Sequence, residues 1–245
     1  MAGRCNPSLS MRVVTARRVC EDLRASLESR VVVLSLLSWS FAAEPSFASL
    51  EAAGWAEVAT RDTDVGSVRV EHRRVGEVDC LQGIVTTKTA VPKLHEVVLD
   101  VPSSPRWSHV SLVISDLLAS SGDTVEFVQM LDVPNWTMVA DRYWVLRAET
   151  LRGANGSVRF RWNRLDAAKA HPKAVEKALA YSSSAVEPPV NWGEWVFTPT
   201  AGGTEVRYRA CSDVGGRLPQ GIQKWVASRT LPDTVADMVR EAGRR

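Results

Sequence analysis

The sequence predicts an α+β fold in which one curved antiparallel sheet of about nine strands wraps around a long C-terminal helix. Runs of alternating apolar and polar residues, which are typical of strands with one buried face, recur along most of the chain. Apolar residues at helical spacing follow the last of these runs. Strands and helices do not alternate, which argues against a parallel nucleotide-binding sheet, and no glycine-rich phosphate-binding motif is present.

Glycine, proline and other turn residues mark the boundaries of the individual helices and strands. A short helix comes first, because Pro45 stands near its first turn and Gly54 ends it. After the third alternating run, apolar residues between Pro92 and Pro102 recur at helical spacing, which predicts a helix there. Residues 166–185 are polar and rich in alanine and predict a loop with a short helix. The runs expected to form strands are residues 55–60, 67–75, 78–89, 111–119, 124–132, 141–151, 157–165, 192–200 and 204–212.

The first 44 residues differ from the rest of the chain. An uncharged apolar run at residues 31–43 follows six arginines, which are Arg4, Arg12, Arg17, Arg18, Arg24 and Arg30. This order is typical of a secretory signal peptide, and the run is shorter than the roughly 20 residues of a membrane span. We therefore predict an extension over residues 1–44 that is cleaved near Ala43 or Glu44, and a secreted or periplasmic protein. If the segment is instead a buried or amphipathic helix, the protein is cytoplasmic.

The composition narrows the classes of function. The net charge of +2 comes from 30 basic and 28 acidic residues that are interleaved, so no nucleic-acid-binding surface is indicated. The four histidines show no metal-ligand spacing, and no serine lies in a nucleophile elbow. We therefore predict no catalytic residues, no metal and no cofactor. Nine tryptophans suit either a core or the wall of a cavity for an apolar ligand.

Two cysteines lie outside the N-terminal extension, Cys80 and Cys211, far apart in sequence. An exported protein could join them in one disulfide. We expect instead two unpaired, mostly buried cysteines, because free cysteine packs as a small apolar residue.

From about Pro45 to Gly243 the sequence resembles a START domain, a lipid-transfer module of the helix-grip superfamily. The matching segments, in order, are GWAEVATRDTDVGSVRVEHRRV, a helix from Pro92 to Trp107 ending in SPRW, ADRYWVL, WGEWVFTP, GGTEVRYRACSDVGGRLP and TLPDTVADMV. The resemblance implies a domain over residues 45–245 with the helix-grip fold. It also implies a tunnel between sheet and C-terminal helix for one lipid or other apolar molecule, carried or sensed by a monomer with transient membrane contact. The alternative is a cyclase-like or hydrolase-like enzyme of the same superfamily, acting on an apolar substrate in the same cavity.

Strand parity predicts which side chains line this cavity, since alternate residues of a strand face the same side. The predicted lining residues of the sheet are Phe127, Gln129, Trp144, Leu146, Phe160, Trp162, Trp195, Phe197 and Tyr208. Sterol-carrying relatives can place a buried acid and a buried arginine at positions that correspond to Gln129 and Ala148. Neither residue is charged here, which indicates a more apolar cavity or polar contacts from Gln129.

The C-terminal helix is predicted to close the tunnel. Its first apolar stripe is Leu218, Ile222, Trp225 and Val226, and its second, after Pro232, is Val235, Met238, Val239 and Ala242. The two stripes do not align on one straight helix, so Pro232 either kinks the helix or starts a second segment. We expect residues 215–230 to form a lid hinged at Gly215 and Gly216, and the part after Pro232 to anchor it.

Overall fold

The computed structural model describes residues 47–134, 139–213 and 220–245, and for residues 220–227 it describes the helix but not the side chains. The nine strands of this part are β1 (Ala56–Thr63), β2 (Gly66–Val75), β3 (Val78–Thr87), β4 (Leu112–Ser121), β5 (Thr124–Leu131), β6 (Arg142–Arg152), β7 (Val158–Arg164), β8 (Val190–Thr200) and β9 (Gly203–Asp213). The helices are α2 (Phe47–Glu51), α3 (Val91–Leu99), the 3-10 turn η1 (Val101–Ser103), α4 (Ser104–Trp107), α5 (Ala167–Ala170), α6 (Pro172–Tyr181) and α7 (Gln220–Arg244).

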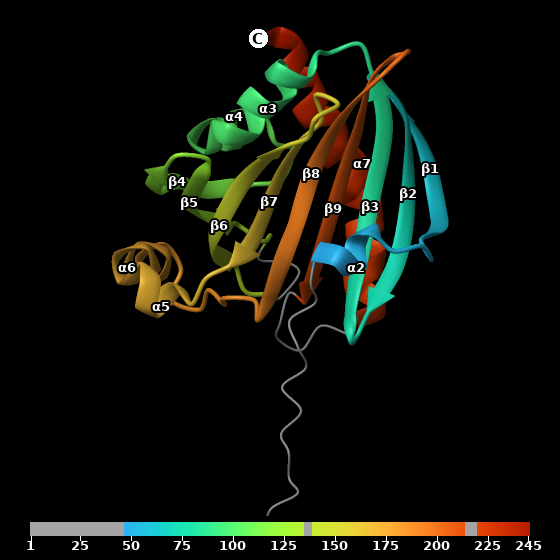
Figure 1. Ribbon diagram of the computed structural model, residues 1–245. Helices are drawn as coiled ribbons and strands as arrows, with labels where there is room; N and C mark the ends of the chain where they lie inside the picture. Colours follow the sequence, from blue (N-terminus) through green and yellow to red (C-terminus); the bar gives the residue numbers. More distant parts are fainter. Residues whose placement is uncertain (1–46, 135–138, 214–219) are drawn as a thin grey trace, which may run out of the picture. The chain divides into compact units, whose positions relative to one another are not determined.

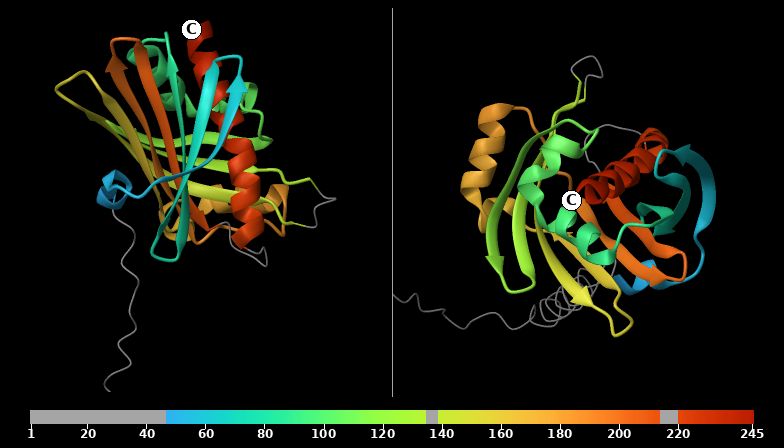
Figure 2. Two further views of the ribbon diagram at one scale, coloured as in Figure 1. Left: turned by 90° about the vertical axis from the view of Figure 1, so that its right-hand side faces the viewer. Right: turned by 90° about the horizontal axis from the view of Figure 1, so that it is seen from above.

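All nine strands form one antiparallel sheet in the order β1-β2-β3-β9-β8-β7-β6-β5-β4. Hairpins join most neighbours, and β9 inserts between β3 and β8, so the first meander and the later strands share one sheet. Figures 1 and 2 show the sheet curving around α7, with α3 and α4 at one end. The predicted fold class is confirmed.

The main core fills the concave side of the sheet. Val235, Met238 and Val239 of α7 are almost completely buried there together with Leu94 and Val97 of α3. Close approach of α7 depends on Gly83 in β3, since a Cβ at this position would lie 2.9 Å from Cγ2 of Val235. The apolar half of the alternating strand pattern therefore faces α3 and α7.

The convex side carries two smaller clusters. Helices α5 and α6 cover Ile114, Val128 and Met130 of the strands at one edge, while α2 covers Cys80 and Cys211 near the middle. The two helices of the first cluster are a correction, because residues 166–185 were expected to hold one short helix in a loop. Their buried residues are alanines, Ala167, Ala174 and Ala178, which give a weak apolar pattern although they pack closely on the sheet.

Two further expectations about helices change. The expected helix from Pro92 to Trp107 is divided into α3, η1 and α4, with the first break at Asp100. The C-terminal helix runs through Pro232 as one element, so the interpretation that a second segment starts there is wrong. Leu231 and Val235, on either side of the proline, are both buried. This packing offsets the backbone hydrogen bond that a proline inside a helix removes.

The expectation of two unpaired cysteines is also wrong, because Cys80 and Cys211 form a disulfide. The two residues are directly opposite one another on β3 and β9, with their Cα atoms 4.2 Å apart. The proximity cannot be read from the sequence, because 131 positions separate the cysteines and only strand pairing brings them together.

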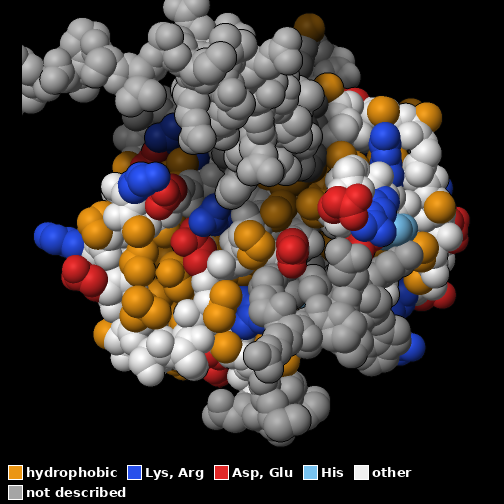
Figure 3. Space-filling view, turned by 90° about the horizontal axis from the view of Figure 1, so that it is seen from below, with side chains coloured by type: hydrophobic (Ala, Val, Ile, Leu, Met, Phe, Trp, Pro, Cys, Tyr) orange, Lys and Arg blue, Asp and Glu red, His pale blue; other side chains and the backbone are white. Residues whose placement is uncertain are grey.

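On the described part of the face shown in Figure 3, basic and acidic side chains lie next to one another. Ion pairs such as Arg152 with Asp123 and Lys177 with Asp116 reflect the interleaved charge of the sequence. No helix of the described residues is long and apolar enough to cross a membrane.

Candidate ligand cavity

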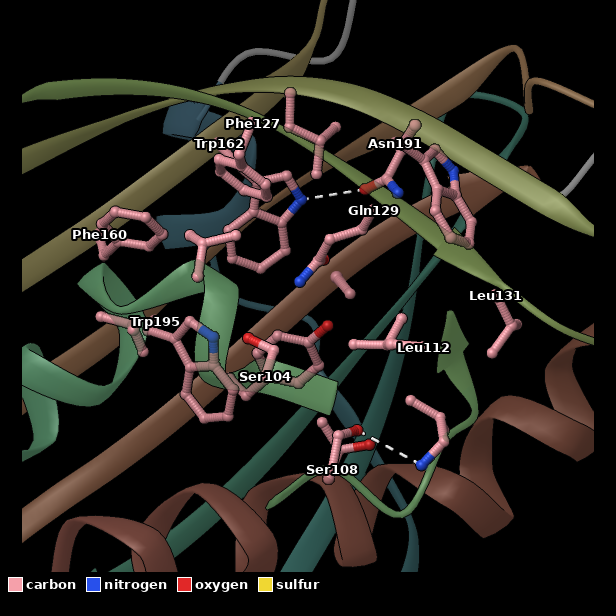
Figure 4. Close-up of a pocket in the computed structure, with 18 of the residues that line it drawn as sticks. Ser104, Ser108, Leu112, Phe127, Gln129, Leu131, Phe160, Trp162, Asn191 and Trp195 are labelled. Carbon is pink, nitrogen blue, oxygen red and sulfur yellow. Dashed lines mark hydrogen bonds between the residues drawn. The ribbon is translucent and has the colours of Figure 1, made fainter. Parts of the chain in front are cut away.

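A cavity of about 340 Å³ lies on the concave side of the sheet, between the strands, the α3–α4 region and α7. Strands β4 to β9 supply its floor, and Val98, Trp107 and Thr234 lie on the facing helices. Figure 4 shows Phe127, Gln129, Phe160, Trp162 and Trp195 around the cavity. Residues of six strands therefore meet at one mostly apolar site.

Eight of the nine predicted sheet residues line the cavity, namely Phe127, Gln129, Trp144, Leu146, Phe160, Trp162, Trp195 and Tyr208. Their contact with a ligand stays a prediction. The ninth, Phe197, points to the predicted side of β8 but is fully buried in the main core and is not among the described lining residues. It stacks on Trp195 at a ring distance of 6.3 Å, one step further along the strand than the cavity reaches. Parity assigns a side of the sheet, but it does not show where a cavity ends.

The predicted lid lies largely outside the described residues. Gly215, Gly216 and Leu218 belong to the undescribed segment, and the side chains of Ile222, Trp225 and Val226 are not described either. The hinge and the first apolar stripe therefore stay predictions.

The sequence did not predict the lining residues of the helices and loops, which include Val98, Val101, Ser104, Trp107, Ser108, Thr230 and Thr234, nor Asn191 of β8. The motif SPRW contains Ser104 and Trp107, and its sequence indicates only the end of a helix. Short, broken helices such as η1 and α4 give too few residues for a periodic pattern, so no signal in the sequence assigns their inward face.

Aromatic rings pack closely on the cavity floor. Tyr208 lies between Trp162, with ring centroids 5.7 Å apart, and Trp195, with centroids 4.3 Å apart. Trp162 on β7 can reach Tyr208 on β9 because Gly193 of the intervening strand has no side chain. A Cβ at Gly193 would lie 2.5 Å from Cζ2 of Trp162 and closer still to the carbonyl oxygen of Arg209. The glycine thus makes room for the indole ring across the sheet.

The polar side chains among the described lining residues are all uncharged. The indole N–H of Trp162 donates to Oδ1 of Asn191 at 2.9 Å, as Figure 4 shows. The amide of Gln129 donates to Oγ of Ser115 at 3.2 Å, and Ser115 in turn donates to the carbonyl of Val101 at 2.7 Å. Burial raises the pKa of Tyr208 to about 12, so its hydroxyl stays protonated at neutral pH. In the described part of the chain, no cluster of side chains suits a metal ion.

Ion pairs hold the part of α7 that follows Pro232. Asp237 accepts hydrogen bonds from both the backbone N–H and Nδ1 of His109, each at 2.7 Å. Arg240 bonds Asp237 and makes two further bonds to Asp64 in the β1–β2 turn. The hydrogen bonds to these carboxylates raise the pKa of Arg240, and the bond from Arg240 lowers the pKa of Asp64. This half of the helix is attached both to the sheet edge and to the loop before β4.

The opposite face of the same strands carries a buried ionic cluster. The carboxylate of Glu194 is fully buried and lies 2.7 Å from Nη1 of Arg209 and 2.9 Å from Nε of Arg161. Glu51 of α2 pairs with Arg159 and Arg161 at the outer side of the cluster. Strand parity therefore keeps these charges away from the cavity, and α2 shields them from solvent.

Comparison with known proteins identifies the fold. No protein-family model matches the chain, and no curated protein matches it. Among solved structures, a fragment of the STAR-related lipid transfer protein from Xanthomonas axonopodis is 20% identical, with a TM-score of 0.63 over 79% of this chain and 100% of that one. Human STARD10 is 14% identical over 80% and 76% of the two chains, with a TM-score of 0.64. Human StAR-related lipid transfer protein 5 is 12% identical over 93% and 98%, also with a TM-score of 0.64. The chain therefore has the helix-grip fold of START domains.

Proposed function

We propose that this protein binds one lipid or other apolar small molecule in the cavity and carries or senses it. The observation that supports this function most directly is an aromatic-rich cavity of about 340 Å³ whose described lining carries no charged side chain. Mostly apolar cavities of roughly 300–1,000 Å³ with a few polar groups are typical of small-molecule sites. Each Å² of ligand surface kept from water contributes about 25 cal/mol. The names of the similar structures, which are lipid transfer proteins, support the same function.

We further propose that α7 controls access to the cavity. Residues 215–230 would act as the lid, with Gly215 and Gly216 as the hinge. The segment after Pro232 would stay in place, which is supported by its buried apolar residues and by the pairing of Arg240 with Asp64 and Asp237. A disulfide that ties the first half of α7 to the facing strands should then block ligand exchange without unfolding the protein.

The protein is proposed to act as a monomer that contacts membranes transiently when it loads or releases its ligand. Export through the N-terminal segment fits the Cys80–Cys211 disulfide, because disulfides persist mainly in oxidising compartments. N-terminal sequencing of the protein from its native source tests this, since an intact Met1 or Met11 would contradict cleavage.

The catalytic alternative has weaker support. Among the described lining residues, Tyr208 is the only side chain that titrates, and its pKa is raised to about 12. General acid–base catalysis works best with groups whose pKa lies near the working pH. This favours binding over turnover.

Native mass spectrometry tests the proposed function. Protein incubated with mixed-lipid vesicles and then separated from them should retain one small molecule per chain, recovered chemically unchanged. The variants Ala210→Phe and Leu112→Trp enlarge side chains that line the cavity and should retain none while they still fold. Ala119→Phe makes the same change as Ala210→Phe at an exposed position of β4 and should bind normally. Failure of the parent protein to retain any lipid would refute carriage, and recovery of a converted molecule would support an enzyme.

A further inference from the structure

The described lining of the cavity offers no counter-charge to an ionised ligand. None of its 21 described lining residues is Asp, Glu, Lys, Arg or His. Charged residues of the same strands pair on the opposite face, as Arg147 does with Glu126 and Arg161 with Glu194. An ionised group that is buried without a partner loses its hydration and gains nothing in return. A carboxylate or phosphate inside this cavity would lose its hydration and find no charged partner among the described side chains.

Tyr208 supplies a hydrogen-bond donor that the described residues do not use. The ring of Tyr208 lines the cavity and is held between Trp162 and Trp195. No residue that the structure describes accepts a hydrogen bond from its hydroxyl. Because the ring is fixed by this packing, a ligand that bonds the hydroxyl orders little of the side chain on binding. Burial keeps the group protonated, with a pKa of about 12.

Gln129 is a second neutral polar group at the cavity. Its amide nitrogen donates to Ser115, and this bond orients the side chain that Figure 4 shows among the lining residues. An amide has two N–H donors and one carbonyl acceptor, so this bond leaves part of its capacity unused. The described polar groups that line the cavity are therefore dipoles rather than charges.

We propose that the cavity selects an uncharged ligand that carries a hydrogen-bond acceptor, such as a ketone or ester oxygen, and that Tyr208 recognises this acceptor. The inference rests on the proposed function, since it specifies the ligand class of the same cavity. It excludes ligands whose ionised group must enter the cavity, such as a fatty acid anion.

Three pyrene compounds that differ in one substituent test the inference. Pyrene lacks an acceptor, 1-acetylpyrene adds a ketone, and pyrene-1-carboxylate adds an ionised group at pH 7.5. Quenching of tryptophan fluorescence reports their binding to the full-length protein. We expect 1-acetylpyrene to bind most tightly and the carboxylate to bind roughly 30-fold or more weakly than the ketone, because its charge is unpaired.

The variant Tyr208→Phe keeps the ring and removes only the hydroxyl. This variant should bind 1-acetylpyrene about 3- to 10-fold more weakly than the parent does, which is the usual contribution of one hydrogen bond, and its affinity for pyrene should be unchanged. Tyr181→Phe, the same change at an exposed residue of α6, serves as the matched control and should alter neither affinity.

The outcomes separate the two proposals. If pyrene itself fails to bind, or still binds Ala210→Phe and Leu112→Trp, the proposed function is contradicted. If pyrene binds but the carboxylate binds as tightly as the ketone, the inference of an uncharged ligand is wrong while the binding function stands. Equal binding of 1-acetylpyrene to the parent and to Tyr208→Phe would refute the role of Tyr208.

Discussion

Substitution of Gly193 by alanine should both destabilise the sheet and displace Trp162 from the cavity floor. The new methyl group would lie 2.5 Å from the indole and would also meet the carbonyl oxygen of Arg209 on the neighbouring strand. The indole could rotate away, but the backbone carbonyl cannot move without separating β8 from β9. The contact therefore cannot be relieved by one flexible side chain.

The expected magnitude follows from two contributions. Overpacking of a buried site costs about 1–3 kcal/mol, and loss of the ring contact between Trp162 and Tyr208 costs about 1 kcal/mol more. The free energy of unfolding should thus fall by about 2–4 kcal/mol. In a domain of this size that corresponds to a melting temperature lower by roughly 5–15 °C. Binding of apolar probes should weaken as well, because Trp162 lines the cavity.

Urea unfolding followed by tryptophan fluorescence measures the first effect, and probe titration measures the second. Gly202→Ala is the matched control, since its Cβ would meet only side-chain atoms, at 3.9 and 4.0 Å. This variant should stay within about 0.5 kcal/mol of the parent. If Gly193→Ala proved as stable as Gly202→Ala, the close packing of Trp162 over β8 would be wrong.

Two further predictions concern stability. Cys80→Ser should lower the free energy of unfolding by roughly 4–5 kcal/mol, because the disulfide closes a long loop, and a reductant should then have no additional effect in urea unfolding. Equal stability of the parent with and without reductant would contradict this. Burial lowers the pKa of His95, so the unfolded state takes up a proton first as the pH falls below about 6.5. The parent should therefore lose stability between pH 7.5 and pH 5.5, and His95→Asn should lose less; parallel pH profiles would exclude this contribution.

Much of the fold could be predicted from alternation alone. In β7, Phe160 and Trp162 face the core while Arg161 faces the ionic cluster, as their apolar and charged character indicates. Burial of the apolar face contributes most of the stabilisation, so the pattern of side chains determines which side of each strand turns inwards.

Features that depend on distances between strands were decided by the tertiary structure. Cys80 pairs with Cys211 only because β9 inserts beside β3 in one particular register. Trp162 reaches Tyr208 only because Gly193 lies between them. The same parity that places Tyr208 at the cavity places Phe197 in the packed core.

By itself, then, the sequence determined the fold class and the inward faces of β5 to β9, because hydrophobic burial acts residue by residue along the chain. The extent of the cavity, its helical wall and the position of Tyr208, from whose hydroxyl no described residue accepts a hydrogen bond, were decided only by the tertiary structure. A cavity is the space that several packed elements leave between them, and its volume depends on how all of their side chains meet.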